Sequence, residues 1–104
     1  MQKTFLFFQA WLKKSIQRDN FLEALGYYHE KVLQPLVEIL RIKYQPTKYD
    51  YYLKDISRDL PKEILTKLES LYKIDSMADI KSKIPKANRL FFRVANEIDI
   101  QNPL

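Results

Sequence analysis

The chain has 104 residues, with 18 Lys or Arg, 13 Asp or Glu and a formal net charge of +5 at pH 7. This length fits one domain with a single core. The absence of cysteine excludes disulfides, thiolate nucleophiles and cysteine-based metal sites. Only one glycine is present, and because the tight turns of sheets consume glycine, the composition favours an all-α fold.

No apolar run approaches the ~20 residues that a membrane span requires. The apolar run at residues 5–8 is also too short for the core of a signal peptide. We therefore expect a cytoplasmic protein with no membrane among its partners. The positive charge is compatible with an anionic partner but does not require one.

The first predicted helix spans residues 3–18 and carries one broad apolar face. This face consists of Phe5, Phe8, Trp11, Leu12 and Ile16. Asn20 follows the break after this helix and is expected to cap the next one, with Glu23 at the capping-box position.

The second predicted helix runs from residue 20 to about residue 44. Its expected buried side chains are Leu22, Leu25, Val32, Leu36, Ile39 and Leu40. Pro35 lies inside it and is expected to kink it, because its ring clashes with the carbonyl one turn back and it donates no backbone hydrogen bond. The alternative is that Pro35 ends one helix and begins another.

A turn is expected at residues 45–48, followed by a short helix or irregular segment at 50–58. A helix over 61–73 begins with Pro61, and a capping box of Ser76 and Asp79 opens the last helix, about 77–98. Pro85 is expected to kink this last helix near its first third. Its apolar positions recur at helical spacing: Ile80, Ile84, Ala87, Phe91, Val94 and Ile98. Residues 1–104 thus predict one domain, a small antiparallel bundle of four main helices and a short one.

His29 is the only histidine and falls on the apolar face of the second helix. It is either a general base or ligand at a cleft, or a partly buried side chain hydrogen-bonded within the bundle. One histidine without cysteine does not supply the ligands of the usual zinc sites.

Two cations end the second helix. Counting 100° per residue, Lys43 lies on the buried face, where it either extends out of the bundle or points into a cleft. Arg41 falls on roughly the opposite side. Both also suit the negative end of the helix dipole.

A basic stripe is predicted on the last helix, opposite its apolar face. It comprises Lys86, Arg89 and Arg93, with Lys81 and Lys83 nearby. Such a stripe either contacts phosphates or is only solvated. A Gly-rich phosphate loop is excluded, because Gly26 is the single glycine.

The most distinctive segment is residues 32–61, in which a helix ends in a basic, tyrosine-rich, proline-punctuated turn. With PLVEILRIKYQP, the tyrosines after it, RDLP at 58–61 and LESLYKI at 68–74, it resembles the helical C-terminal half of kanamycin-nucleotidyltransferase-like bacterial nucleotidyltransferases. The resemblance covers about residues 5–95.

In that family a catalytic half precedes the helical half and carries a Gly-Ser turn and metal-binding aspartates, and neither motif occurs here. The resemblance therefore implies a non-catalytic accessory domain with no catalytic residue, metal ligand or cofactor of its own. Mg²⁺ and a nucleoside triphosphate are implied for the full enzyme, which transfers a nucleoside monophosphate to a hydroxyl, typically of an antibiotic.

The resemblance also implies that this domain forms one wall of the substrate cleft. The substrate-binding candidates are Arg41, Lys43, Tyr44, Tyr49 and Tyr52, with His29 the weakest of the set. The expected partners are the catalytic domain and a nucleotide or small-molecule substrate. Enzymes acting on aminoglycosides line this wall with carboxylates, whereas here the turn is basic, which favours anionic phosphates or an acidic catalytic half.

Two other functions remain open. The chain is alternatively a free-standing helical protein-interaction or antitoxin-like module, or a small basic nucleic-acid binder. A homodimer is a further possibility under each of these hypotheses.

Overall fold

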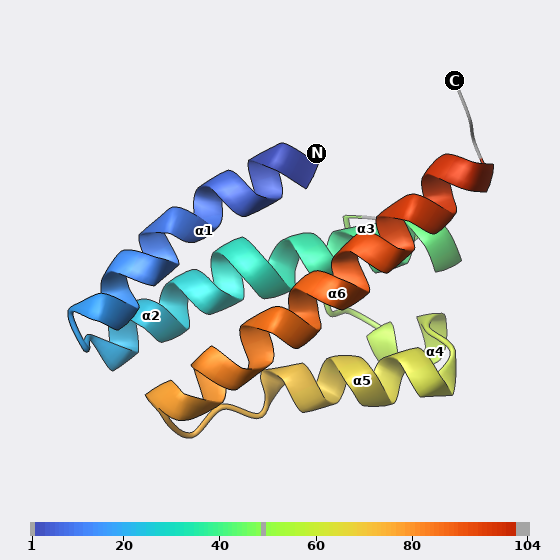
Figure 1. The fold of residues 1–104 in the computed structure, drawn as a ribbon. Helices are drawn as coiled ribbons and strands as arrows, with labels where there is room; N and C mark the ends of the chain where they lie inside the picture. Colours follow the sequence, from blue (N-terminus) through green and yellow to red (C-terminus); the bar gives the residue numbers. More distant parts are fainter. Residues whose placement is uncertain (1, 49, 102–104) are drawn as a thin grey trace.

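The computed structural model describes residues 2–48 and 50–101, with side chains described for residues 9–48 and 50–99. No strand occurs in these ranges, so the predicted all-α fold is confirmed (Figure 1). The elements are α1 (Gln2–Gln17), α2 (Phe21–Tyr27), the π-helix η1 (Tyr28–Leu33), α3 (Gln34–Tyr44), the 3-10 turn η2 (Pro46–Lys48), α4 (Ile56–Asp59), α5 (Lys62–Tyr72) and α6 (Met77–Gln101).

The central feature of the bundle is the continuous helical run of α2, η1 and α3. The helix α1 folds back along α2 and η1, and α6 packs against η1 and α3. In Figure 1, α6 crosses this run diagonally, while α5 lies on the opposite side of α6 from α1. The element η2, the following turn and α4 connect α3 to α5.

The helix continues through Pro35, and its hydrogen-bonding pattern changes just before this residue. The backbone N–H of Gln34 donates to the carbonyl of His29, five residues back, which is the π-helical pattern. Pro35 then occupies the first turn of α3, where a proline ring is tolerated. A π-helical segment thus precedes Pro35 within a continuous helical run, and the expected kink stays a prediction.

The core lies between the central run, α5 and α6. It includes Leu36, Leu40, Leu68, Phe91 and Val94. The expected spacing in α6 is confirmed, since Ile80, Ala87, Phe91 and Val94 are buried and Ile84 and Ile98 are half-buried. The helix α6 also runs through Pro85 without a break.

Two apolar side chains that were expected inside are outside. Leu22 is 77% exposed and Trp11 is 49% exposed. The inner face of α1 instead includes Gln9, Leu12 and Ser15, of which the two polar residues have partners across the bundle. Gln9 exchanges two amide hydrogen bonds with Asn88 of α6, at 2.9 and 3.3 Å.

The break between α1 and α2 is built largely as expected. The Asn20 side chain accepts a hydrogen bond from the backbone N–H of Glu23 at 3.1 Å, which caps α2. The Glu23 carboxylate does not complete a capping box. It accepts hydrogen bonds from the hydroxyl of buried Ser15 and from Arg18, which lower its pKa, and so ties α2 to α1.

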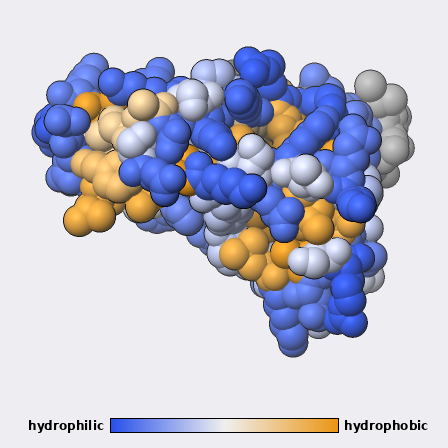
Figure 2. All heavy atoms as spheres, turned by 90° about the horizontal axis from the view of Figure 1, so that it is seen from below, coloured by the Kyte–Doolittle hydropathy of each residue, from blue (hydrophilic) through white to orange (hydrophobic). Residues whose placement is uncertain are grey.

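The outer surface is mixed in character. Figure 2 shows a mainly hydrophilic face on which apolar side chains gather in separate patches. No helix within the described part of the chain is long and apolar enough to span a bilayer.

Candidate functional site

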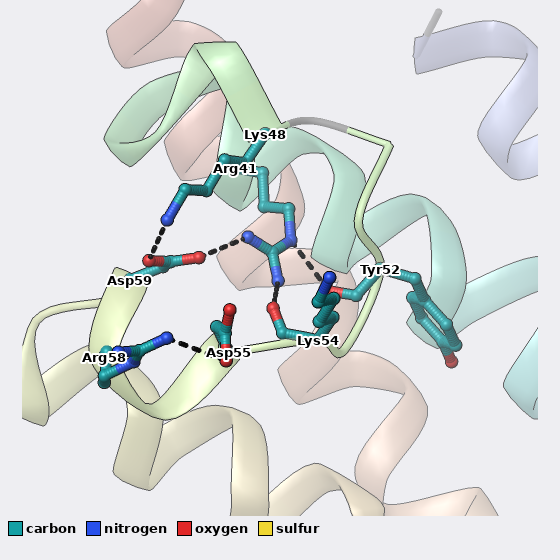
Figure 3. Close-up of polar contacts among 7 residues, drawn as sticks. All are labelled: Arg41, Lys48, Tyr52, Lys54, Asp55, Arg58 and Asp59. Atoms are coloured by element: carbon teal, nitrogen blue, oxygen red, sulfur yellow. Dashed lines mark hydrogen bonds and ion pairs between the residues drawn. The ribbon is translucent and has the colours of Figure 1, made fainter.

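The segment from η2 to α4 is held by one buried arginine. Arg41 of α3 is fully buried, and its Nε donates to the carbonyl of Tyr52 at 2.7 Å. Its Nη1 donates to Oδ2 of Asp59 at 2.8 Å and its Nη2 to the carbonyl of Lys54 at 2.6 Å (Figure 3). We call this set of contacts the Arg41 clamp.

Asp59 is the anionic end of the clamp. Its other carboxylate oxygen, Oδ1, accepts a hydrogen bond from Nζ of Lys48 at 3.2 Å. The hydrogen bond from Arg41, reinforced by Lys48, holds the pKa of Asp59 below its usual range although burial opposes this shift. The clamp thus joins α3, η2 and α4 through one carboxylate.

The clamp stabilises a backbone that would otherwise be unfavourable. Tyr52 has a φ of 52° and Asp55 a φ of 58°. This is the left-handed backbone conformation, which residues other than glycine adopt uncommonly. The Tyr52 carbonyl is bound directly by Arg41, while Asp55 forms an ion pair with Arg58 at 2.9 Å. Strained residues persist where surrounding contacts hold them, and such residues cluster at binding sites.

Tyrosines connect the clamp to the π-helix. The hydroxyl of Tyr52 lies 2.9 Å from the hydroxyl of Tyr72, and the Tyr72 ring meets His29 edge-on at 5.5 Å between centroids. Burial and the hydrogen bond to Tyr52 raise the pKa of Tyr72. Next to it, Tyr28 is fully buried and donates to the carbonyl of Leu71 at 2.7 Å. His29 is therefore a half-buried member of an aromatic cluster.

Two hollows flank these tyrosines. One, of about 230 Å³, lies between α4 and α5 and is mainly apolar; it is lined by Leu53, Ile56, Ser57, Leu65, Leu68, Glu69 and Tyr72. The other, of about 220 Å³, is lined by Gln34, Glu38, Asp50 and Tyr52. We call this second one the acidic hollow, because both its charged side chains are carboxylates.

The burial of Arg41 was not expected. The sequence places it opposite the buried face, and in the structure this second side is enclosed as well. The side of α3 away from α6 is covered by the segment from η2 to α4, which we call the clamped segment. This helix is therefore buried over most of its circumference. Arg41 contributes by positioning other groups from inside the fold.

Lys43 and Tyr44 lie together at the end of α3, and Lys43 contacts α6. The Lys43 ammonium forms an ion pair with Oε2 of Glu97 and lies 5.2 Å from the centroid of the Tyr44 ring. Both side chains are half-buried. Tyr49 falls outside the described residues, so its predicted role is unchanged.

The structure thus divides the sequence candidates into two groups. Arg41, Tyr52 and His29 are joined through the clamp and Tyr72, while Lys43 pairs with Glu97 and lies over the ring of Tyr44. Sequence reasoning missed Asp59, Tyr72 and Glu97 as their partners. The signal for Asp59 was its place in RDLP at 58–61, an acid directly before a leucine and a proline.

The basic stripe of α6 is only partly free. Arg93 Nε lies 3.5 Å from Oε1 of Glu97, and Lys83 donates to the carbonyl of Ser70 at 2.5 Å. The exposed members with no carboxylate partner among the described residues are Lys81, Lys86 and Arg89.

Within residues 9–48 and 50–99, no three His, Cys, Asp or Glu side chains lie close enough together to hold a metal ion. No protein family, no curated protein and no solved structure matches the chain.

Proposed function

We propose that the chain is a cytoplasmic, non-catalytic binding domain of a nucleotidyltransferase, which forms one wall of a cleft beside a catalytic domain. The observation that carries this proposal is the Arg41 clamp. A chain reversal requires only a turn, whereas here a fully buried guanidinium binds the strained Tyr52 and also Lys54 and Asp59. Rigid support of this kind is what a binding surface needs.

The clamped segment exposes aromatic and apolar side chains that the fold does not need at its surface. Tyr51 is 42% exposed and Leu53 is 41% exposed, and Tyr52 lines the acidic hollow. Such aromatic and apolar side chains provide contact area for a neighbouring domain or for the flat rings of a substrate. In this proposal Tyr52 and Tyr44 contribute to the wall, and Arg41 holds it in place.

The charge around the segment bears on the substrate. Arg41 and Lys48 share the carboxylate of Asp59, and Lys43 is paired with Glu97, so each of these three cations already has a carboxylate partner within the domain. The acidic hollow retains the carboxylates of Glu38 and Asp50. At this wall we therefore infer an acceptor substrate with amino and hydroxyl groups, and the nucleoside triphosphate is left to the catalytic domain.

The proposal is tested by titrating the purified chain with kanamycin, as an amino-sugar probe, and with ATP, while backbone amide shifts are followed by NMR. Kanamycin should shift residues around 34–54, and Glu38→Gln/Asp50→Asn should weaken its binding about tenfold, as loss of charge-assisted hydrogen bonds does. The matched control is Glu63→Gln/Asp75→Asn, which removes the same charge from outside the acidic hollow.

A second measurement addresses catalysis. The chain alone should transfer no nucleotide from any nucleoside triphosphate with Mg²⁺, because phosphoryl transfer relies on metal-holding carboxylates that converge. Turnover by the purified chain, or kanamycin binding that the control variant weakens equally, would contradict the proposal.

A further inference from the structure

A further hollow lies away from the Arg41 clamp, between α5 and α6. Its volume is about 330 Å³. It is lined by Thr66, Lys67, Ser70, Leu71, Lys86 and Leu90. Figure 1 shows α5 and α6 diverging from the short turn that joins them.

The lining combines an apolar base with a positively charged rim. Leu71 and Leu90 are buried, whereas Lys67 and Lys86 are exposed, one on each helix. No carboxylate lines the hollow. Lys67 has only a 3.6 Å contact with the exposed Glu63, so both ammonium groups are available to an anion.

Hydroxyl groups and a third lysine complete the surroundings. Lys83 donates to the carbonyl of Ser70 at 2.5 Å and lies 3.5 Å from the Ser70 hydroxyl oxygen. Because that oxygen acts as an acceptor toward Lys83, the hydroxyl proton of Ser70 remains free for another acceptor. The same contact ties α6 to the last turn of α5 and fixes the spacing of the hollow.

We propose that this hollow binds a small phosphate monoester with an apolar or aromatic body. A phosphate dianion matches two ammonium groups and a hydroxyl donor, and the body of the ester would cover Leu71 and Leu90. The volume falls at the small end of ligand pockets, about 300–1,000 Å³. This inference uses none of the residues of the proposed cleft wall and does not depend on that function.

The probe is phenyl phosphate, titrated into the whole chain and followed by backbone amide shifts. Saturable shifts should appear at residues 66–71 and 86–90. Phenol and inorganic phosphate should each bind more weakly than the ester, because phenol lacks the phosphate group and inorganic phosphate lacks the apolar body. Equal binding of phenol, or shifts spread over all lysines without saturation, would overturn the proposal.

Two matched double variants locate the site. Lys67→Gln/Lys86→Gln should weaken phenyl phosphate binding about tenfold or more. Lys62→Gln/Lys81→Gln removes the same charge from exposed positions of the same helices outside the hollow, and should change the affinity by less than about twofold. If both variants weakened binding equally, the attraction would be long-range and the hollow would not be a site.

A single-stranded oligonucleotide provides the competing ligand. If it bound the chain more tightly than phenyl phosphate and lost more affinity with Arg89→Gln/Arg93→Gln than with Lys67→Gln/Lys86→Gln, the ligand surface would be the stripe of α6. That result would replace the phosphate-ester site with a nucleic-acid surface. Unchanged thermal unfolding of all the variants, whose altered side chains are exposed, confirms that the comparison reports binding.

Discussion

Among single residues, Arg41 is the one that holds the clamped segment against α3. Its guanidinium satisfies the carbonyls of Tyr52 and Lys54 and the carboxylate of Asp59 without access to water. Removing one partner of a buried charged pair leaves the other charge desolvated and unpaired, which is far more costly than losing a surface pair. The clamped segment should therefore depend on this one side chain.

The change Arg41→Ala should lower the free energy of unfolding by about 3–5 kcal/mol. Arg41→Lys should recover little of it, because an ammonium lacks the planar fork that reaches three acceptors. Urea denaturation measures both. The control Arg58→Ala removes an exposed ion pair of the same segment and should cost less than about 1 kcal/mol. An Arg41→Ala protein as stable as this control would contradict the role of the clamp.

Asp59 makes the clamp sensitive to acid. Its pKa is lowered in the folded state, chiefly by Arg41, so the stability it contributes is fully present above the unfolded pKa of about 3.9. That contribution is lost as the pH falls through the lower folded value. The stability difference between the wild-type chain and Asp59→Asn should therefore shrink below about pH 4. Thermal unfolding between pH 2 and 7 measures it, and a difference independent of pH would exclude this linkage.

At the scale of elements, the N-terminus of α2 and the π-helix show two ways in which local sequence sets a helix. Asn20 caps α2 through its own side chain, which is a contact between residues three apart. The π-helix η1 is followed by Pro35, which lacks the N–H needed to continue the α-helical pattern. It also carries His29, whose ring meets that of Tyr72 of α5 edge-on, and Tyr28, which donates to the carbonyl of Leu71.

The change Asn20→Ala should destabilise the protein by about 1 kcal/mol, the usual cost of losing an N-cap side chain. Gln17→Ala is the control, since Gln17 is exposed at the end of α1 and should contribute within about 0.5 kcal/mol. Both are measured by chemical denaturation. Equal effects of the two changes would show that the cap contributes nothing measurable.

At the scale of the whole molecule, stability rests on the core shared by α3, α5 and α6. Leu36→Ala and Phe91→Ala should each cost about 2–5 kcal/mol, because both side chains are buried and their removal leaves cavities. Lys86→Ala and Leu22→Ala should stay within about 0.5 kcal/mol, since both positions are exposed. Denaturant titration measures these changes. If Leu22→Ala strongly lowered the free energy of unfolding, Leu22 would have to be buried and α2 would pack differently against its neighbours.

The fold class and most helix boundaries could be read from the sequence because they depend on short-range interactions. Apolar spacing in α6, the cap at Asn20 and the turn after Tyr44 act over a few residues, and each is where it was expected. The single glycine and the absence of cysteine limited the fold in the same local way. Contacts between side chains that are distant in the sequence could not be predicted in this way.

Only the tertiary structure decided which side of each helix is covered. Counting 100° per residue assumes an α-helix throughout, and η1 breaks that assumption before Arg41 is reached. The count also assumes one buried side, whereas α3 is covered by α6 and by the clamped segment. Burial of Arg41 and exposure of Leu22 depend on elements that are distant in sequence. Local periodicity determines that a helix forms, and packing between distant elements determines what each of its sides contacts.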